Sequence, residues 1–570
     1  MDFGFCKDVF LKSVKNPEKA GSPLKMGNRL CIIMEILHLG GNKMNLLAEK
    51  TDKSRKLLLI CLISVFAWGL AAHNYGFVHS SFSHDSLFEF NGDGVSNYIR
   101  LINGRFLSPV CRKLFRTDLT LPWLIGVMGL CWTGLAVFLT ARILRMEHPV
   151  LLVVLSGIFT ANLTVSSTIA TFLHDYDCDM LALLFSVLAV YSWQKGKWGF
   201  LPGAVFVMCS LALYQSYICV SITLLMLVCM MALLDGESLA SVLLRGLRGC
   251  AMLLLGGGLY YVALKAVGQL TQTTLMTDAY NSLDRPLQVV NMSWYDIKYV
   301  FKETYSIFFE RLTQVLSPFP VTTRRVTKAL LRLTVALLPI SIVALRVRPG
   351  QALLFLVLTA LLPLGMNLMH LITLGGTSHE LMIFAYWLSY LLPLLVEHRL
   401  LLRAGEAQGK WKAWLLPTCR WTQAAIIALV LVLLLGNVQT ANAMYLKKDL
   451  EQDAYLSVMT RVVYRMEETE GYVPGETPVV MVGLPQQINE VIPGFEAYRK
   501  PNGMWMSDVL NFGDAGHWSA YFKYILQNPA KIVAGEQLYA DPRVEAMPCY
   551  PAQGCTELID GTLVVKLSQP

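Results

Sequence analysis

Charged residues are scarce in this chain of 570 residues. Only 15% of it is Asp, Glu, Lys or Arg, while 54% is apolar, and a typical soluble domain carries about 25% charged residues. The mean hydropathy is +0.48. Repeated apolar runs approach or exceed the ~18 residues that indicate a membrane-spanning helix. These shortages exclude an ordinary soluble enzyme and predict a protein that crosses a bilayer many times.

The signatures of nucleotide and metal chemistry are also missing. The sequence has no P-loop, no Gly-x-Gly-x-x-Gly motif and no zinc-ligand spacing, so it carries no recognisable machinery for nucleotide hydrolysis or nucleotide-sugar binding. Its net charge of +8 comes from short basic clusters between apolar runs. That pattern is typical of membrane proteins and does not indicate a nucleic-acid partner.

The apolar runs predict an all-α polytopic membrane domain over residues 57–445, with about eleven helices. The expected spans are 57–72, 119–141, 149–170, 179–194, 199–214, 217–234, 249–267, 329–345, 352–373, 381–396 and 422–445. Basic clusters flank alternate links, and the positive-inside rule places these links in the cytoplasm. A basic stretch at 324–332 falls on the opposite side and breaks this pattern.

The two ends of the chain are predicted to differ. Residues 1–56 resemble neither a secretory signal nor a folded unit, because the first long apolar run begins at Leu57. We expect them to be a cytoplasmic extension or the product of an over-long start. By the same count of spans, residues 446–570 lie outside the cytoplasm, so the sequence predicts a bacterial inner or plasma membrane protein with an extracytoplasmic tail.

The tail is predicted to be a small α/β domain. It has a helical pattern at 446–470, an apolar strand-like run at 478–483 and a closing strand at 563–567. Cys549 and Cys555 lie in this domain, where they either close a small disulfide loop or remain free thiols.

The first outer loop, residues 73–118, carries acids first and then bases. Asp85, Glu89 and Asp93 precede Arg100 and Arg105, with apolar residues between them that would let the loop lie beside lipid. This order suits sugar transfer from a polyprenyl phosphate, in which a carboxylate accepts the proton of the attacking hydroxyl and a guanidinium holds the leaving phosphate. The alternative interpretation is that these charges only solvate the loop and cap its helices.

Three alternating acids, Asp175, Asp177 and Asp179, begin the fourth expected span. Carboxylates are favoured at helix N-termini, so capping accounts for at least one of them. The functional alternative is that one acid faces the same cavity as Asp85 and binds acceptor hydroxyls or a divalent cation. An acid-only cluster suits Mg²⁺ or Mn²⁺.

An outer hairpin supplies two further acceptor-site candidates, Tyr214 and Gln215. Aromatic residues are common at the membrane interface, so Gln215 is the less routine of the two. Lys265 and His379 also approach the outer face, where each is an interfacial anchor or, alternatively, a phosphate contact.

Three of these segments together resemble a known family. The run from His84-Asp85-Ser86 through Asn103-Gly104-Arg105-Phe106-Leu107-Ser108-Pro109, the Asp175-Tyr-Asp-Cys-Asp179 segment and Tyr214-Gln215-Ser-Tyr217 are similar to the bacterial type II serotype-converting glucosyltransferases of the GT-C superfamily. The likeness covers residues 55–470 and extends to the tail. It implies a multi-span enzyme that moves a sugar, typically glucose, from undecaprenyl phosphate at the outer leaflet onto a cell-surface polysaccharide such as O-antigen or cell-wall glycan.

The resemblance also implies residue roles. It assigns the catalytic carboxylate to the first outer loop, at Asp85 with Glu89 and Asp93 as alternatives, and the donor phosphate to Arg105. We expect Arg100 to be a second ligand of that phosphate. The chain departs from the family where Ser86 follows Asp85, since many relatives have adjacent acids there, and this leaves the identity of the base open. We expect inversion at the sugar, because direct displacement by one activated hydroxyl needs no covalent intermediate.

Two other classes compete with a transferase. A lipid-linked sugar flippase or transporter requires functional charges deep inside its spans, and the predicted spans are nearly free of acids at mid-depth. A scaffold whose tail binds cell-wall polymer is the third class. The sequence therefore favours an enzyme with a one-sided site, whose partners are a polyprenyl-phosphate sugar, a surface glycan and the bilayer.

Overall fold

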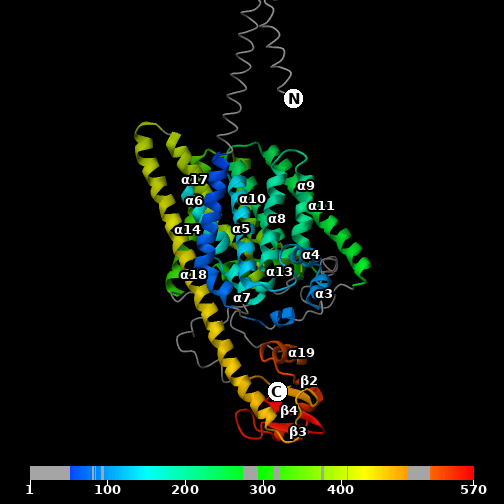
Figure 1. The fold of residues 1–570 in the computed structure, drawn as a ribbon. Coiled ribbons are helices and arrows are strands. Elements are labelled where there is room, and N and C mark those ends of the chain that lie inside the picture. The colour runs from blue at the N-terminus through cyan, green and yellow to red at the C-terminus, as the bar shows by residue number, and fades with distance from the viewer. Residues whose placement is uncertain are drawn as a thin grey trace, which may run out of the picture. The chain divides into compact units, whose positions relative to one another are not determined.

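The computed structural model describes residues 52–79, 82–83, 85–90, 95–273, 293–313, 320–373, 378–406, 408–485 and 514–569. The chain divides into two units between Leu59 and Ile60, and the arrangement described here is that of residues 60–570. These residues form a bundle of apolar helices and a small C-terminal sheet (Figure 1).

The bundle follows from the long apolar runs of the sequence. The first span is a helix over Asp52–Val78. The other helices of the bundle, among the described residues, are α5 (Pro122–Leu144), α6 (Pro149–Thr160), α7 (Leu163–Phe172), α8 (Tyr176–Trp193), α9 (Phe200–Leu213), α10 (Ile218–Leu234), α11 (Leu239–Thr271), α14 (Pro320–Ala344), α15 (Pro349–Met366), α17 (Leu391–Glu406) and the apolar part of α18 (Gly409–Glu467). Proline begins four of them, at the position where its missing N–H costs no hydrogen bond.

Helices α5 and α8 pack closely because a glycine faces an aromatic ring. The ring of Tyr176, at the start of α8, is fully buried. A Cβ added to Gly129 of α5 would lie 2.2 Å from that ring, which is far inside van der Waals contact. Glycine therefore sets the distance between the two helices at this point, where Tyr176 stands between Asp175 and Asp177.

One predicted span is broken. Helix α6 ends at Thr160 and α7 begins at Leu163, with Asn162 capping α7 by accepting a hydrogen bond of 2.9 Å from the backbone N–H of Val165. Asn437 donates to the carbonyl of Ala161 at 3.0 Å. The backbone groups freed by the break are thus satisfied inside the bundle, as the membrane interior requires.

The number of spans is lower than the sequence predicted. Within the described residues, seven helices are long and apolar enough to cross a membrane, and an eighth is added if the broken pair is one span. The expected span 199–214 is the short helix α9, and the expected span 381–396 begins as the 3₁₀-helix η7 (Phe384–Tyr390). The all-α polytopic fold class is confirmed. A hydropathy pattern depends on the local composition alone. It therefore does not detect where a helix ends or that it is broken by two residues.

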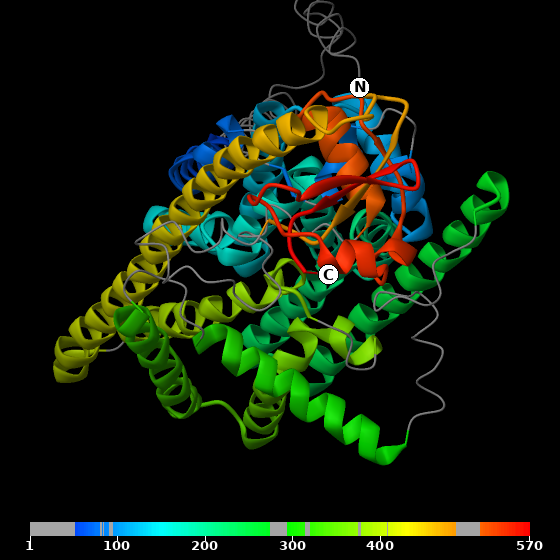
Figure 2. The same cartoon turned by 90° about the horizontal axis from the view of Figure 1, so that it is seen from below.

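Further helices, most of them short, cover the end of the bundle that the sequence assigns to the outer side. They are η2 (Asp85–Phe90), α3 (Val95–Ile102), α4 (Leu107–Phe115), η3 (Leu173–Asp175), η4 (Gln215–Tyr217), α13 (Trp294–Thr313), α16 (Leu368–Ile372) and η6 (Glu380–Met382). Helix α13 lies across the bundle axis (Figure 2) and exposes Trp294, Tyr295 and Tyr299. Such an aromatic surface is typical of a helix at the membrane interface.

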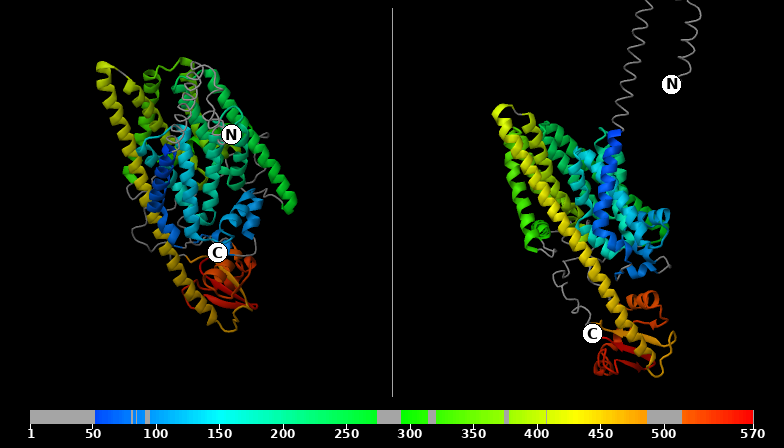
Figure 3. Two further views of the ribbon diagram at one scale, coloured as in Figure 1. Left: turned by 45° about the horizontal axis from the view of Figure 1, so that its top comes forward. Right: turned by 60° about the vertical axis from the view of Figure 1, so that its left-hand side comes forward.

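A single helix of 59 residues, α18 (Gly409–Glu467), connects the bundle to the C-terminal sheet (Figure 3). The sheet has the strand order β2-β1-β4-β3. Its strands are β1 (Pro478–Val482), β2 (Lys531–Ile532), β3 (Thr556–Ile559) and β4 (Thr562–Lys566). Strand β1 is parallel to β2 and β4, and β3 is antiparallel to β4. The strands predicted at 478–483 and 563–567 are therefore the two central ones.

The central strands are apolar on both faces because helices pack on one side and a second cluster on the other. Val479, Met481, Leu563 and Val565 face one core, together with α19 (Ala515–Ala520) and the π-helical turn η10 (Tyr521–Ile525). Alternate residues face the other core, which includes Val544 and Met547 at the short helix α20 (Pro542–Ala546). Cys549 and Cys555 are free thiols.

Candidate functional site

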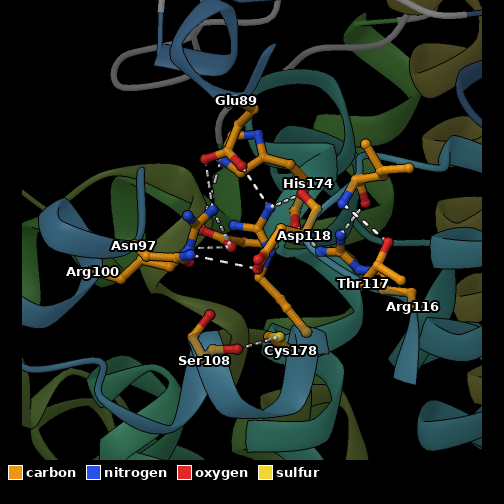
Figure 4. A network of polar contacts seen from close by, with 12 residues as sticks. Glu89, Asn97, Arg100, Ser108, Arg116, Thr117, Asp118, His174 and Cys178 are labelled. Atoms are coloured by element: carbon orange, nitrogen blue, oxygen red, sulfur yellow. Dashed lines mark hydrogen bonds and ion pairs between the residues drawn. The ribbon is translucent and has the colours of Figure 1, made fainter. Parts of the chain in front are cut away.

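The first outer loop is attached to the bundle by buried ion pairs (Figure 4). The guanidinium of Arg100, on α3, lies 2.7 Å from a carboxylate oxygen of Glu89 and 2.7 Å from one of Asp175. Arg112, on α4, lies 2.7 Å from the other oxygen of Glu89. Glu89 therefore links α3 to α4, and Arg100 links both to the turn that precedes α8. These distances are those of charge-assisted hydrogen bonds.

The sequence explains why these charges point inward. Helix α3 is strongly amphipathic, with Tyr98 and Ile99 exposed and Arg100 buried in its last turn. Arg100 and Arg112 keep 4% and 2% of their side chains exposed. Buried charges persist only when they are paired, so the three acid–arginine contacts fix the position of η2, α3 and α4 over the end of the bundle.

The protonation of Glu89 follows from this setting. Burial raises the pKa of its carboxyl, but the positive charges of His174, Arg100 and Arg112 outweigh that effect and hold the pKa at about 2. Glu89 is therefore ionised at neutral pH, and a carboxylate with so low a pKa accepts a proton poorly.

Acid is expected to weaken this loop. A carboxyl whose pKa is depressed in the folded state stabilises the protein above the unfolded pKa of about 4.3, and that contribution is lost as the pH falls through the folded value. We therefore expect the thermal midpoint of the purified protein to fall between pH 4.5 and pH 2, and Glu89→Gln to remove part of this fall. Tryptophan fluorescence melts at several pH values measure it. The same slope in both proteins would contradict the pairing.

A second buried pair lies beside the first. The guanidinium of Arg116 contacts both carboxylate oxygens of Asp177, at 2.7 and 3.2 Å, and donates to the carbonyls of His174 and Leu119. Both side chains are almost fully buried. This geometry is bidentate, and it joins the segment after α4 to the first turn of α8.

Removing one partner of this pair is expected to reduce stability. Asp177→Asn leaves the Arg116 guanidinium buried without its counter-charge, which typically costs about 3–5 kcal/mol. The matched control is Asp235→Asn, because Asp235 pairs with Arg399 at 2.8 Å but remains 39% exposed, and such pairs contribute about 0–1 kcal/mol. Thermal melts in detergent compare the two. Equal midpoints would show that the buried pair contributes nothing.

Arg105 differs from the other three arginines because its guanidinium is not taken up by a close carboxylate. It lies 4.0 Å from Asp175 and 4.4 Å above the ring centroid of Tyr214, with 23% of the side chain exposed. Its Nε has no hydrogen-bond partner among the described residues. A guanidinium that is held in place but has free donors is suited to binding an anion.

The turn that carries Arg105 is held from two other elements. Gln215 of η4 donates to the carbonyl of Asn103 at 2.8 Å, and the hydroxyl of Tyr260 on α11 donates to the carbonyl of Gly104 at 3.1 Å. Gly104 has a φ of +74°, a conformation that glycine adopts without strain. Gln215 and Tyr260 therefore position Arg105 through its backbone.

Asp179 lies one helical turn beyond Asp175 and is also buried. Among the described residues, no hydrogen bond or ion pair reaches its carboxyl group. Asp179 is nevertheless close enough to Asp175 and Arg105 to interact with both electrostatically. The hydroxyl of Tyr217 interacts electrostatically with Asp179 and has no hydrogen-bond partner in the described part of the chain. Buried polar groups without partners are uncommon and often mark functional sites.

The structure thus brings together most of the predicted site residues. Glu89, Arg100, Arg105, Asp175, Asp179, Tyr214 and Gln215 form one connected region, and Asp177 is paired beside it. Asp85 begins η2, but its side chain lies outside the described residues, as does the whole of Asp93. Among the described residues, no group of three or more His, Cys, Asp or Glu side chains is placed to hold a metal ion.

Sequence reasoning missed Arg112, Arg116 and Tyr260, whose partners are distant in the sequence. It also missed a second polar cluster, formed by Glu303, Arg311, His370 and Glu380. Arg311 of α13 lies 3.6 Å from Glu380, and Glu303 lies 3.3 Å from His370. Burial raises the pKa of Glu380 to about 7, although Arg311 opposes this. An amphipathic pattern at 294–313 is the signal that could have revealed α13.

Comparison with known protein families gave a match. A family model described as "Glucosyl transferase GtrII" matches residues 74–396, which is more than half of the chain. No curated protein and no solved structure matches the chain. The matched range contains the outer loop, the acids at the start of α8 and the Tyr214-Gln215 turn, and it excludes the C-terminal sheet.

Proposed function

Because the chain belongs to the GtrII glucosyl transferase family, a family of glycosyltransferases, we propose that it moves a hexose, glucose, from a polyprenyl-phosphate donor onto a cell-surface polysaccharide. The family predicted from three short segments of the sequence is confirmed. Donor, acceptor and mechanism form the proposal, and they depend on what the site can do chemically.

The observation that carries the proposal is the state of Arg105. Three neighbouring arginines are bound to carboxylates at 2.7 Å, whereas the guanidinium of Arg105 lies 4.0 Å from Asp175, belongs to a side chain that is 23% exposed, and has an Nε without a hydrogen-bond partner among the described residues. A donor sugar phosphate is an anion whose charge grows as its bond to the sugar breaks. A fixed guanidinium with free donors stabilises that developing charge.

The proposed reaction is a single displacement. An acceptor hydroxyl attacks the anomeric carbon, its proton passes to the carboxylate of Asp85, and the bond between that carbon and the phosphate oxygen breaks. The electron pair leaves with the polyprenyl phosphate, which Arg105 holds. Because one hydroxyl displaces one phosphate, the configuration at the sugar inverts. Glu89 and Asp93 remain the alternative bases, and the low pKa of Glu89 makes it the weaker of these.

The acceptor is proposed to enter beside Arg105. Asp179 offers a buried carboxyl group with no bonded partner in the described chain, and the oxygens of such a group accept hydrogen bonds from sugar hydroxyls. Asp175 and Tyr214 lie beside the same guanidinium. Gln215 contributes by holding the turn that carries Arg105. Arg100 contributes by its hydrogen bond to Asp175. Asp177 is proposed to hold the start of α8 through Arg116.

We propose that this site faces away from the cytoplasm. The links that join α5 to α6, α8 to α9 and α14 to α15 carry arginines or lysines and lie at the end of the bundle opposite α3 and α4 (Figure 1). Positively charged links are typically cytoplasmic. The N-terminus would then be cytoplasmic and the C-terminal domain extracytoplasmic, in the bacterial inner or plasma membrane.

A transfer assay tests the proposal. Full-length protein in liposomes is given polyprenyl-phosphate glucose with a radiolabelled sugar, together with a surface glycan. We expect label to pass to the glycan. Movement of labelled lipid between leaflets without transfer to the glycan would instead support a flippase, and binding of glycan alone would support a scaffold.

A further inference from the structure

The core of the C-terminal domain contains two residues of the first outer loop. Phe82 and Leu87 pack in the same buried cluster as residues of α18, β1, α19, η10 and β4. Leu87 is fully buried and lies within η2, two residues after Asp85 and two before Glu89. The domain is therefore in direct contact with the short helix that carries the proposed base, although about 370 residues or more separate the two segments.

Ring and backbone contacts define this interface. The rings of Phe82 and Tyr521 are 5.7 Å apart, centroid to centroid. Gln452 of α18 donates to the carbonyl of Phe82 at 3.0 Å. From the bundle, the hydroxyl of Ser83 donates to the carbonyl of Thr171 on α7 at 2.6 Å. The start of η2 is thus held by the tail on one side and by the bundle on the other.

A 3₁₀-helix of six residues cannot hold its own position. Such helices are short, with poor hydrogen-bond geometry, so their placement depends on packing. Full burial of a leucine side chain contributes about 1.5–3 kcal/mol, and for Leu87 much of that contact comes from the C-terminal cluster. If the domain moved away, η2 would lose this contact and its backbone would be less restrained.

We propose that the C-terminal domain positions η2, so that the tail is a working part of the transferase site. The expected effect of this positioning on catalysis rests on the proposed function. Phe82, Leu87 and Tyr521 are positioning residues, which act on transfer through the backbone of η2 and do not touch the substrate. The family match ends at residue 396, so this contact is supplied by a part of the chain that lies beyond the match.

The test measures exchange and transfer in the same full-length variants. Tyr521→Ala removes the ring that contacts Phe82. We expect faster deuterium uptake in the peptide 82–90 and a fall in kcat of about 10- to 100-fold, the effect of a displacement near 1 Å at a reacting group. The donor KM should change less than about twofold, because Arg105 is held separately by Gln215 and Tyr260. Tyr521→Phe, which keeps the ring, should restore both.

The matched control is Met547→Ala. Met547 is buried in the cluster on the opposite face of the sheet, so its truncation weakens the domain without touching η2. We expect neither exchange at 82–90 nor kcat to change. Equal effects of Met547→Ala and Tyr521→Ala, or unchanged exchange in Tyr521→Ala, would overturn the proposal. Absence of transfer in the wild type would overturn the proposed function alone, since the exchange measurement needs no substrate.

Discussion

Replacing Asp85 by asparagine is expected to lower glucosyl transfer about 100- to 10,000-fold, the range that a general base contributes. Asparagine keeps the shape of the side chain but cannot accept the hydroxyl proton. Glu89 is the weakest of the three proposed bases, because it is held between two arginines with a pKa of about 2. Initial rates of label transfer at saturating donor and acceptor measure the effect.

Expression, membrane insertion and melting temperature of Asp85→Asn should match those of the wild type, which separates a chemical defect from a folding defect. Glu470→Gln, which neutralises an exposed acid after α18, serves as the control and should transfer at the normal rate. Asp93→Asn tests the remaining alternative base. Full activity in Asp85→Asn together with a large loss in Asp93→Asn would move the base to Asp93.

Arg105→Ala is expected to lower kcat about 100- to 1,000-fold, which is typical when one preorganised donor to a developing anion is removed. The substitution should leave stability nearly unchanged, because Asp175 keeps its 2.7 Å contact with Arg100 and no other close partner of Arg105 is left without a charge. Arg105→Lys should recover only part of the rate, since an ammonium is a point charge and lacks the planar fork.

Lys113→Ala is the matched control for this prediction. Lys113 is an exposed cation on α4 of the same outer loop, so its removal tests whether net positive charge alone draws the donor to the site. We expect normal transfer in this variant. If Lys113→Ala and Arg105→Ala reduced transfer equally, long-range attraction would explain the effect better than a phosphate contact.

Much of the candidate site was predictable because its residues lie in short segments with unusual composition. The alternation at Asp175, Asp177 and Asp179 and the Gly104-Arg105 pair are visible in the sequence, and the structure places Arg105 4.0 Å from Asp175. The sequence also indicates Gln215 as the less routine residue of its hairpin. The structure explains this, since it holds the turn before Arg105.

The partners of these residues were not predictable from one sequence. Arg116 and Asp177 are 61 positions apart, and nothing local in either segment signals the pair. The same holds for Leu87, one of the apolar loop residues that the sequence predicts to lie beside lipid, whereas the structure packs it in the core of the C-terminal domain. An apolar residue in an outer loop fits both situations, and only tertiary structure separates them.

The fold was predictable in class but not in detail, for a related reason. The break at Asn162 interrupts the helix while leaving the surrounding composition apolar, so a hydropathy window continues across it. Helix α13 shows the opposite problem. Its charged and aromatic residues lower its mean hydropathy, so the apolar pattern predicts only a link where the structure has a helix of 20 residues. Composition recognises spans best when the whole helix is apolar.

Because α18 is one unbroken helix, the rotational phase of its tail is fixed by its membrane portion. At 1.5 Å per residue its 59 residues extend for about 88 Å. One residue inserted in its exposed length would rotate everything beyond by about 100°, whereas four would return nearly to the starting phase and lengthen the shaft by about 6 Å. The length of α18 therefore determines how far the sheet lies from the membrane.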